Sequence, residues 1–334
     1  MIINHKMEQI SDCLFEGNKI FVLAIFDSCD FIVSTIQKLL LYDSNYKLIN
    51  TIAIDKNIYS ICIKNQNIFY TGNEEGVIEE WEQKRNKQRT YKKTKISSNA
   101  HWCEISKLLL INNYIYSSSY DGTIKIRNIE KRDKIDETLY EIKDLESVYS
   151  IIYDENNKLL ICGANKGFYI WNVIDIKDKK IDKIYEDEKS KIYSPNSLQF
   201  LKQNNGLVEI IIGSENWIKI YSVTKIEEKF NVDLKQTIKI DYICSAITFL
   251  QSDTQIILIT GELKNIDDDD DENYKIRLYQ NLNDQNPIII NYAHCNKING
   301  FIQYSNNTLF SYSNDGLIKF WNIKVDKENY IKNI

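Results

Sequence analysis

Histidine, cysteine and the carboxylates are the residue types through which this chain could perform acid–base, nucleophilic or metal chemistry. Its 334 residues include only three histidines, His5, His101 and His294, which stand far apart in the sequence. The chain contains no Gly-x-Ser-x-Gly nucleophile motif, no His-Glu-x-x-His zinc motif and no Walker or Gly-x-Gly-x-x-Gly phosphate loop. Because no group of residues points to a catalytic centre, we expect a protein that is not an enzyme.

The seven cysteines are scattered one at a time, and no two have the Cys-x-x-Cys spacing of a zinc or redox site. Isolated cysteines in apolar segments behave as small buried hydrophobic side chains in a reducing compartment. We therefore expect no metal site, no cofactor and a cytoplasmic protein, with nuclear or cytoskeletal association as alternatives. No secretory signal is visible, and no apolar run approaches the roughly twenty residues of a transmembrane segment.

One stretch concentrates negative charge, with six adjacent carboxylates from Asp267 to Glu272. Such a run repels itself and carries no apolar anchor, so we expect a solvated insertion. A contact for a basic partner and a weak divalent-cation site are the alternatives, although the spacing does not fit an EF-hand loop.

A second stretch concentrates positive charge between residues 84 and 95. Cations on an edge strand discourage association between sheets, which explains part of this charge. The remainder favours an anionic target, either RNA, an acidic membrane or an acidic protein surface, with a nuclear-import signal as a further alternative. The candidate anion-binding residues are Lys84, Arg85, Lys87, Arg89, Lys92, Lys93 and Lys95. The formal net charge of −5 argues against a protein built mainly to bind nucleic acid.

The elements that must position these residues belong to a repeated unit. A short apolar strand, a polar turn and a second strand that closes on a large side chain recur seven times, at intervals of roughly 40 to 60 residues. Asp121-Gly122 and Asp315-Gly316 supply turns in which glycine adopts a positive φ without steric cost. Strands such as 317–321 are largely apolar on both faces, so each must lie between two other sheets. The closing positions are Tyr42, Trp81, Arg127, Trp171, Tyr221, Tyr279 and Trp321.

This unit resembles the WD40 repeat, and the resemblance covers nearly the whole chain. The Trp-Asp pair that closes the repeat in that family stands here as Trp171-Asn172 and Trp321-Asn322, and the family's Gly-His stands as Ala100-His101 and Ala293-His294. The resemblance implies an all-β fold, a seven-bladed WD40-type β-propeller with four antiparallel strands per blade.

The expected propeller is a single domain over residues 1–334. A strand within residues 1–16, near Glu8 to Phe15, or a strand within residues 328–334 could complete the last blade and close the ring; the sequence leaves both open. The expected blades cover residues 17–53, 57–95, 100–142, 146–186, 192–240, 243–291 and 294–334.

The resemblance also assigns a structural role to two histidines. In the family, this histidine bonds an aspartate of the turn and a serine or threonine, which in turn holds the tryptophan indole. The matching residues in the last repeat are His294, Asp315 and Trp321, with either Ser311 or Ser313. In the third repeat, His101 and Asp121 match together with a serine among Ser117 to Ser119, but Arg127 replaces the tryptophan. The other repeats lack this network, so we expect them to depend more on apolar packing.

Propellers of this family commonly bind partners around the central channel, on the face that carries the blade entrances. The resemblance therefore implies a non-catalytic scaffold or adaptor subunit of a larger intracellular assembly, with other proteins as partners. The alternative is the binding of RNA or an acidic membrane through residues 84–95. Trp102 and Tyr149 could instead pack between blades. The candidate partner-binding residues are Trp102, Tyr120, Tyr149, Glu215, Asn216 and Asn314.

Overall fold

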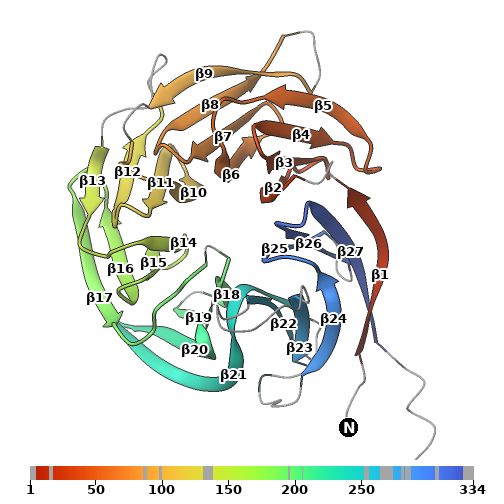
Figure 1. Ribbon diagram of the computed structural model, residues 1–334. Coiled ribbons are helices and arrows are strands. Elements are labelled where there is room, and N and C mark those ends of the chain that lie inside the picture. Colours follow the sequence, from red (N-terminus) through yellow and green to blue (C-terminus); the bar gives the residue numbers. More distant parts are fainter. Residues whose placement is uncertain are drawn as a thin grey trace, which may run out of the picture.

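A ring of antiparallel β-sheets surrounds a central opening in the computed structural model (Figure 1). The structure describes residues 5–14, 18–85, 89–97, 100–130, 138–194, 196–204, 206–251, 256–263, 274–279, 282, 287–304 and 308–325. Every regular element in these ranges is a strand, which confirms the expected all-β propeller architecture. The same ranges hold no helix with the length and apolar character needed to span a bilayer.

Five sheets have four strands each, and four of these follow the chain order directly. The first comprises β2 (Ile20–Ile25), β3 (Phe31–Thr35), β4 (Lys38–Tyr42) and β5 (Leu48–Ala53). The second comprises β6 (Ile58–Asn65), β7 (Ile68–Asn73), β8 (Ile78–Gln83) and β9 (Tyr91–Ser97). The third comprises β10 (Ile105–Ile111), β11 (Tyr114–Ser119), β12 (Ile124–Asn128) and β13 (Thr138–Ile142). The fourth comprises β14 (Val148–Asp154), β15 (Leu159–Ala164), β16 (Phe168–Asp175) and β17 (Lys180–Asp187).

A seven-stranded sheet follows, and it differs from the two separate blades expected at 192–240 and 243–291. Its 23-residue strand β21 pairs with β20 over its first part and with β22 from Ile243 onward. Because β21 contains neither glycine nor proline, nothing in its sequence imposes a turn between the two halves. The strands are β18 (Leu198–Asn204), β19 (Leu207–Gly213), β20 (Glu215–Ile226), β21 (Lys229–Gln251), β22 (Ile256–Leu263), β23 (Tyr274–Tyr279) and β24 (Ile288–His294).

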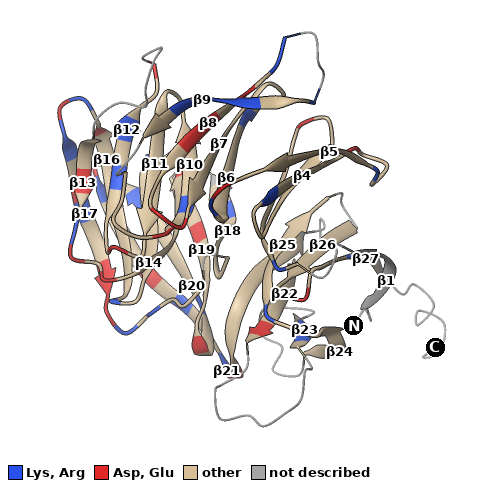
Figure 2. Cartoon of the chain, turned by 45° about the horizontal axis from the view of Figure 1, so that its top comes forward, with Lys and Arg blue, Asp and Glu red and all other residues tan. Residues whose placement is uncertain are grey.

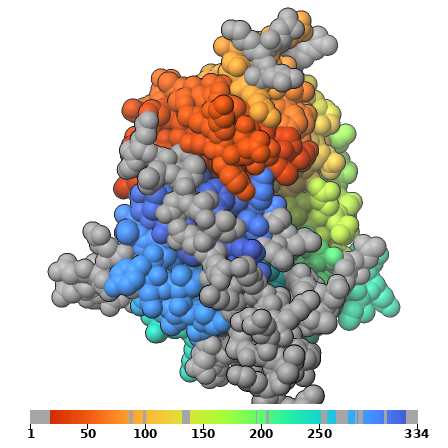
Figure 3. All heavy atoms as spheres, turned by 90° about the vertical axis from the view of Figure 1, so that its right-hand side faces the viewer, coloured from red at the N-terminus to blue at the C-terminus, as the bar shows by residue number. Residues whose placement is uncertain are grey.

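The N-terminal strand closes the ring. The last sheet comprises β25 (Ile298–Gln303), β26 (Thr308–Ser313), β27 (Leu317–Val325) and β1 (His5–Leu14), in that spatial order. Strand β1 runs antiparallel to β27, from the pair His5 and Val325 to the pair Leu14 and Leu317. Of the two closures that the sequence left open, the structure therefore has the N-terminal one, and residues 328–334 lie outside the described ranges. Figure 3 views the molecule from the right-hand side of Figure 1 and shows the first and last sheets next to each other.

The hydrophobic core lies between neighbouring sheets, as expected for strands that are apolar on both faces. Strand β27 shows this division clearly. Its Ile318 and Phe320 pack with Phe31 of the first sheet, whereas its Trp321 packs with Ile259 of the seven-stranded sheet. Burying one large apolar side chain contributes roughly 1.5–3 kcal/mol, so each strand stabilises both of its interfaces.

The ring has two faces. On one, which we call the entrance face, the turn between the second and third strands of a sheet contacts the connection that links neighbouring sheets. The His101 amide donates to the Gly76 carbonyl (3.0 Å), and the Leu145 amide donates to the Gly122 carbonyl (3.3 Å). Gly122 has a φ of 81°, as expected for its turn. The opposite face carries the turns at the other strand ends, including residues 84, 85, 89 and 90 between β8 and β9.

Candidate functional site

The last repeat contains a continuous polar network inside the ring. His294 Nδ1 lies 2.8 Å from Asp315 Oδ2, and His294 Nε2 lies 2.7 Å from Ser311 Oγ. The Trp321 indole donates to the same Ser311 Oγ at 2.8 Å, so the serine in contact is Ser311 and not Ser313. Burial alone would raise the pKa of Asp315, but hydrogen bonds from His294 and two backbone amides hold it below its ordinary value.

The third repeat has the same network with a different closing residue. His101 Nδ1 lies 2.9 Å from Asp121 Oδ2, and His101 Nε2 lies 2.8 Å from Ser117 Oγ. Where the last repeat has an indole, the Arg127 guanidinium donates to Ser117 Oγ (3.1 Å) and to the Ala100 carbonyl (2.6 Å). Burial lowers the pKa of Arg127 to about 10 and also lowers the pKa of His101, despite the adjacent Asp121.

Two other repeats contain polar contacts of their own, although we expected them to depend mainly on apolar packing. The Trp81 indole donates to Thr71 Oγ1 at 3.0 Å. The Tyr221 hydroxyl donates to Asp187 Oδ2 at 2.7 Å and lies 2.9 Å from Ser190 Oγ. The closing side chain can therefore be anchored without a histidine, because any buried donor needs only one well-placed acceptor.

Trp102 projects from the entrance face into solvent. Its side chain is 90% exposed, so it does not pack between sheets. Its backbone amide donates to Asp121 Oδ2 at 3.0 Å, the same carboxylate oxygen that contacts His101. The third-repeat network therefore fixes the backbone from which this indole extends.

Aromatic side chains gather around the mouth of the central channel. The ring centroids of Tyr120 and Tyr149 are 5.1 Å apart, and those of Tyr149 and Tyr193 are 6.4 Å apart. Phe21 and Tyr59 form another pair, with centroids separated by 4.6 Å. The structure thus brings together two of the predicted contact residues and adds three aromatic residues that sequence reasoning missed.

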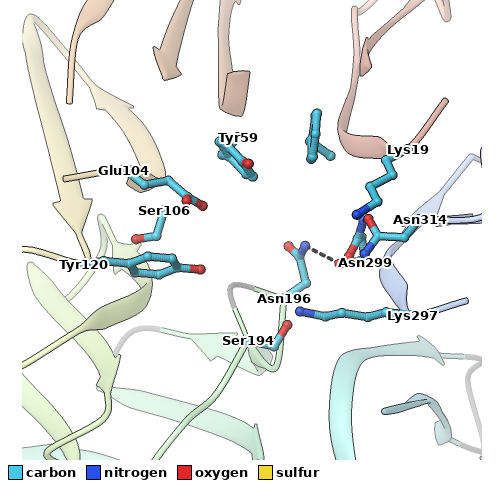
Figure 4. Close-up of a pocket in the computed structure, with 11 residues that line it drawn as sticks. Lys19, Tyr59, Glu104, Ser106, Tyr120, Ser194, Asn196, Lys297, Asn299 and Asn314 are labelled. Carbon is cyan, nitrogen blue, oxygen red and sulfur yellow. Dashed lines mark hydrogen bonds between the residues drawn. The ribbon is translucent and has the colours of Figure 1, made fainter. Parts of the chain in front are cut away.

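A cavity of about 250 Å³ lies at the centre of the ring (Figure 4). Asn314 and Tyr120 line it, whereas the exposed Glu215 and Asn216 at the start of β20 do not. The residues around the cavity are Lys19, Phe21, Tyr59, Glu104, Ser106, Tyr120, Ser194, Asn196, Lys297, Asn299 and Asn314.

Sequence reasoning missed Glu104 and Lys297, although a positional signal was present. Each is the third residue after a repeat histidine, His101 or His294. Each also accepts a backbone hydrogen bond from the following turn, with the Tyr120 amide bonding the Glu104 carbonyl and the Asn314 amide bonding the Lys297 carbonyl. Equivalent positions in the repeats therefore converge on the channel axis.

The charged groups in this cavity are poorly solvated. Burial and the nearby Glu74 raise the pKa of Glu104 to about 7, although Lys297 opposes this shift. Burial lowers the pKa of Lys297, and Glu104 only partly offsets that effect. The cavity therefore contains a carboxyl group that titrates near neutrality opposite a desolvated ammonium group.

The basic run lies along β9 and in the loop before it (Figure 2). Three of its cations form ion pairs with carboxylates of the same chain. Arg89 lies 2.9 Å from Asp30, Lys93 lies 2.8 Å from Glu79, and Lys95 lies 3.2 Å from Glu80. The exposed members are Lys84, Arg85, Lys92 and Lys93. Lys87, like the acidic run Asp267–Glu272, lies outside the described residues.

Cysteines and carboxylates form no cluster that would hold a metal ion in the described part of the chain. Its six cysteines with described side chains are free thiols. Cys162 and Cys244 are buried, whereas Cys29, Cys103 and Cys295 are exposed. On the entrance face, Cys295 directly follows His294 and its backbone amide donates to Asp315, whereas Cys103 lies two residues after His101 and its carbonyl accepts from Ser119 Oγ.

Known proteins are similar to this chain in structure and not in sequence. No protein-family model matches it, and no curated protein shows a significant sequence match. A chain from the crystal structure of a mitotic checkpoint complex superposes with a TM-score of 0.70 at 12% identity, covering 95% of this chain and 96% of its own length. The computationally designed Ika8 protein superposes with a TM-score of 0.60 at 14% identity, covering 91% of this chain and 83% of its own. At such identities the likeness defines the fold alone: the chain is a β-propeller.

Proposed function

We propose that the protein is a non-catalytic scaffold or adaptor subunit of a cytoplasmic assembly and binds other proteins through its entrance face. In this proposal it is a WD40-type propeller of seven blades. The seven-stranded sheet then counts as two blades that share β21, and the five four-stranded sheets supply the others.

The exposed indole of Trp102 is the observation that carries this proposal. Tryptophan is enriched among the residues that dominate binding energy at protein interfaces. The backbone of Trp102 is fixed by Asp121, which His101 holds in turn, so ordering this segment on binding costs little. The aromatic rim formed by Tyr120, Tyr149 and Tyr193 offers further apolar surface around the same channel.

Two further observations support a binding role without catalysis. Both ring nitrogens of His101 and of His294 are engaged in the repeat networks, so neither imidazole has a nitrogen available to transfer a proton to a substrate. The structural neighbour with a TM-score of 0.70 comes from a mitotic checkpoint complex, and its membership of a multi-protein complex is compatible with protein partners for this chain.

Replacing Trp102 with alanine tests the proposal. We expect wild-type protein to retain specific partners from an extract of its native cells, and the Trp102→Ala affinity for the purified partner to be lower by about tenfold or more. The melting temperature should stay nearly unchanged, because the indole is 90% exposed. Ile226→Ala is the matched control, since Ile226 is 65% exposed at the β20 end on the opposite face. Equal binding by wild type and Trp102→Ala would contradict the assignment.

Salt dependence separates this proposal from anion binding through residues 84–95. Because Arg89, Lys93 and Lys95 already pair with carboxylates, we expect partner affinity to change only a fewfold between low and physiological salt. An interface that neutralises many phosphates would lose several orders of magnitude. Affinity of the purified partner at several salt concentrations measures the difference, and a steep loss would favour the basic run.

A further inference from the structure

The central cavity has a cationic wall and a facing carboxyl group. Lys19 and Lys297 extend into the cavity from one side, beside Asn314, whereas Glu104 approaches from the other side (Figure 4). Lys19 precedes the first strand of the first sheet, and Lys297 precedes the first strand of the last sheet. The Asn299 side chain links the two sheets here, because its amide donates to the Ile20 carbonyl at 2.5 Å.

The asparagines of the cavity hold one another in fixed orientations. Asn196 Nδ2 donates to the Asn299 carbonyl at 2.6 Å, and its Oδ1 accepts from Lys107 Nζ at 3.3 Å. Asn299 Nδ2 donates to Asn314 Oδ1 at 2.8 Å. This chain of contacts turns Asn314 so that its Nδ2 donor remains available at the cavity.

Two ammonium groups complete a set of unused donors. Among the described residues, neither Lys19 Nζ nor Lys297 Nζ has a hydrogen-bond acceptor or lies within ion-pair distance of a carboxylate. Lys297 is half-buried, and burial disfavours its charged form because no acceptor compensates for the lost solvation. The half-buried Lys107 adds positive charge behind Asn196. The facing Glu104 offsets only part of this charge, because it is itself desolvated and incompletely ionised at neutral pH.

We infer that this wall binds a tetrahedral oxyanion of the phosphate type, with Lys19, Lys297 and Asn314 as its donors. A tetrahedral dianion offers acceptors in several directions and matches the charge of two lysines, whereas a planar carboxylate supplies a single charge. A cavity of about 250 Å³ has room for such a group and for what it is attached to. The group would come either from a free phosphate compound or from the phosphorylated side chain of a docked protein, and this site is independent of the scaffold role of Trp102.

Calorimetric titration of the full chain with inorganic phosphate and pyrophosphate tests the site. We expect saturable binding at one site, weakened by about tenfold or more in Lys297→Met and in Lys19→Met. Lys235→Met is the matched control, because Lys235 is an exposed lysine on β21, and it should bind as wild type does. A phosphoserine peptide beside its unphosphorylated form distinguishes the two sources: tighter binding of the phosphopeptide than of phosphate indicates a protein-borne group. The melting temperature of each variant is measured first, and only variants that melt near the wild-type temperature are compared. If Lys297→Met fails to fold, Lys19→Met still tests the site.

Absence of saturable phosphate and pyrophosphate binding by the wild type would overturn the inference. So would unchanged affinity in both folded lysine variants. Neither outcome affects the test of partner binding through Trp102. The phosphate titration therefore tests the oxyanion site alone, and the partner affinity of Trp102→Ala tests the scaffold role alone.

The carboxyl group opposite the donors should make binding pH-dependent. Glu104 is faced by Glu74, Lys297, Tyr59 and Tyr120, and its ionisation places negative charge opposite the oxyanion. Sulfate is the suitable probe because its own charge is constant in the neutral range. We expect sulfate affinity to fall as pH rises through neutrality, and Glu104→Gln to bind about fivefold more tightly than wild type at about pH 8. Equal or weaker sulfate binding by Glu104→Gln at that pH would contradict the placement of the anion opposite Glu104.

Discussion

Asp315→Ala is expected to lower the free energy of unfolding by about 1–3 kcal/mol. Asp315 accepts hydrogen bonds from His294 Nδ1 at 2.8 Å and from the backbone amides of Cys295 (2.9 Å) and Leu317 (3.0 Å). Alanine removes all three hydrogen bonds, and the His294 side chain, which is fully buried, cannot turn to water for a replacement. The loss extends toward Trp321, because both His294 and the indole contact Ser311.

Urea-induced unfolding at neutral pH measures this loss. Asp175→Ala is the matched control, because Asp175 also accepts from two backbone amides of its turn, those of Lys177 and Asp178, but contacts no histidine. We expect the control to lose clearly less stability. The pKa of Asp315 is held low in the folded chain, so its contribution is present above the unfolded pKa of about 3.9 and disappears as pH falls through the folded value. Equal losses in both variants would exclude a special role for the histidine contact.

Glu104→Gln is expected to stabilise the protein by about 1–3 kcal/mol at about pH 8. The pKa of Glu104 is raised from 4.5 to about 7 in the folded chain. Between these values the folded chain keeps a proton that the unfolded chain releases, so stability falls as pH rises through the window. Above about pH 7, Glu104 is ionised in the folded chain as well, and the desolvation of its carboxylate lowers the stability by the largest amount. Glutamine has nearly the same shape without the charge, and partial solvation at the cavity mouth limits the gain.

Unfolding measured at about pH 8 and about pH 4 checks the sign. At the lower pH the carboxyl group is mostly protonated in folded and unfolded chains alike, so we expect Glu104→Gln and wild type to be nearly equally stable there. Glu215→Gln, an exposed glutamate on the entrance face, should show no gain at either pH. Destabilisation by Glu104→Gln at the higher pH would mean that the carboxylate has a structural partner. If Glu104→Gln is instead more stable than wild type at about pH 8 and also binds sulfate more tightly, then Glu104 lowers both the stability of the fold and the affinity for the anion.

The sequence by itself determined the features that depend on neighbouring strands. The period of the repeat, the glycine turns and the alternation of apolar residues are local, because they arise within one hairpin. For the same reason the turn aspartate and the closing residue of a repeat could be located in advance, whereas the role of the histidine was assigned through the resemblance to the WD40 repeat. The choice between Ser311 and Ser313 could not, because residues two apart point to the same side of a strand. Only the position of His294, contributed by another sheet, selects Ser311.

The tertiary structure decided what depends on closing the ring. Lys19 and Lys297 stand at opposite ends of the sequence, and they share a cavity wall only because β1 pairs with β27 and places the first sheet beside the last. The ion pair between Arg89 and Asp30 likewise joins two sheets. The sequence alone therefore could not show which cations of the basic run are already paired with carboxylates of the same chain. Local patterns specify hairpins through short-range contacts, whereas the cavity is assembled from one or two residues of many repeats. Its composition therefore emerges only when all the sheets are arranged around one axis.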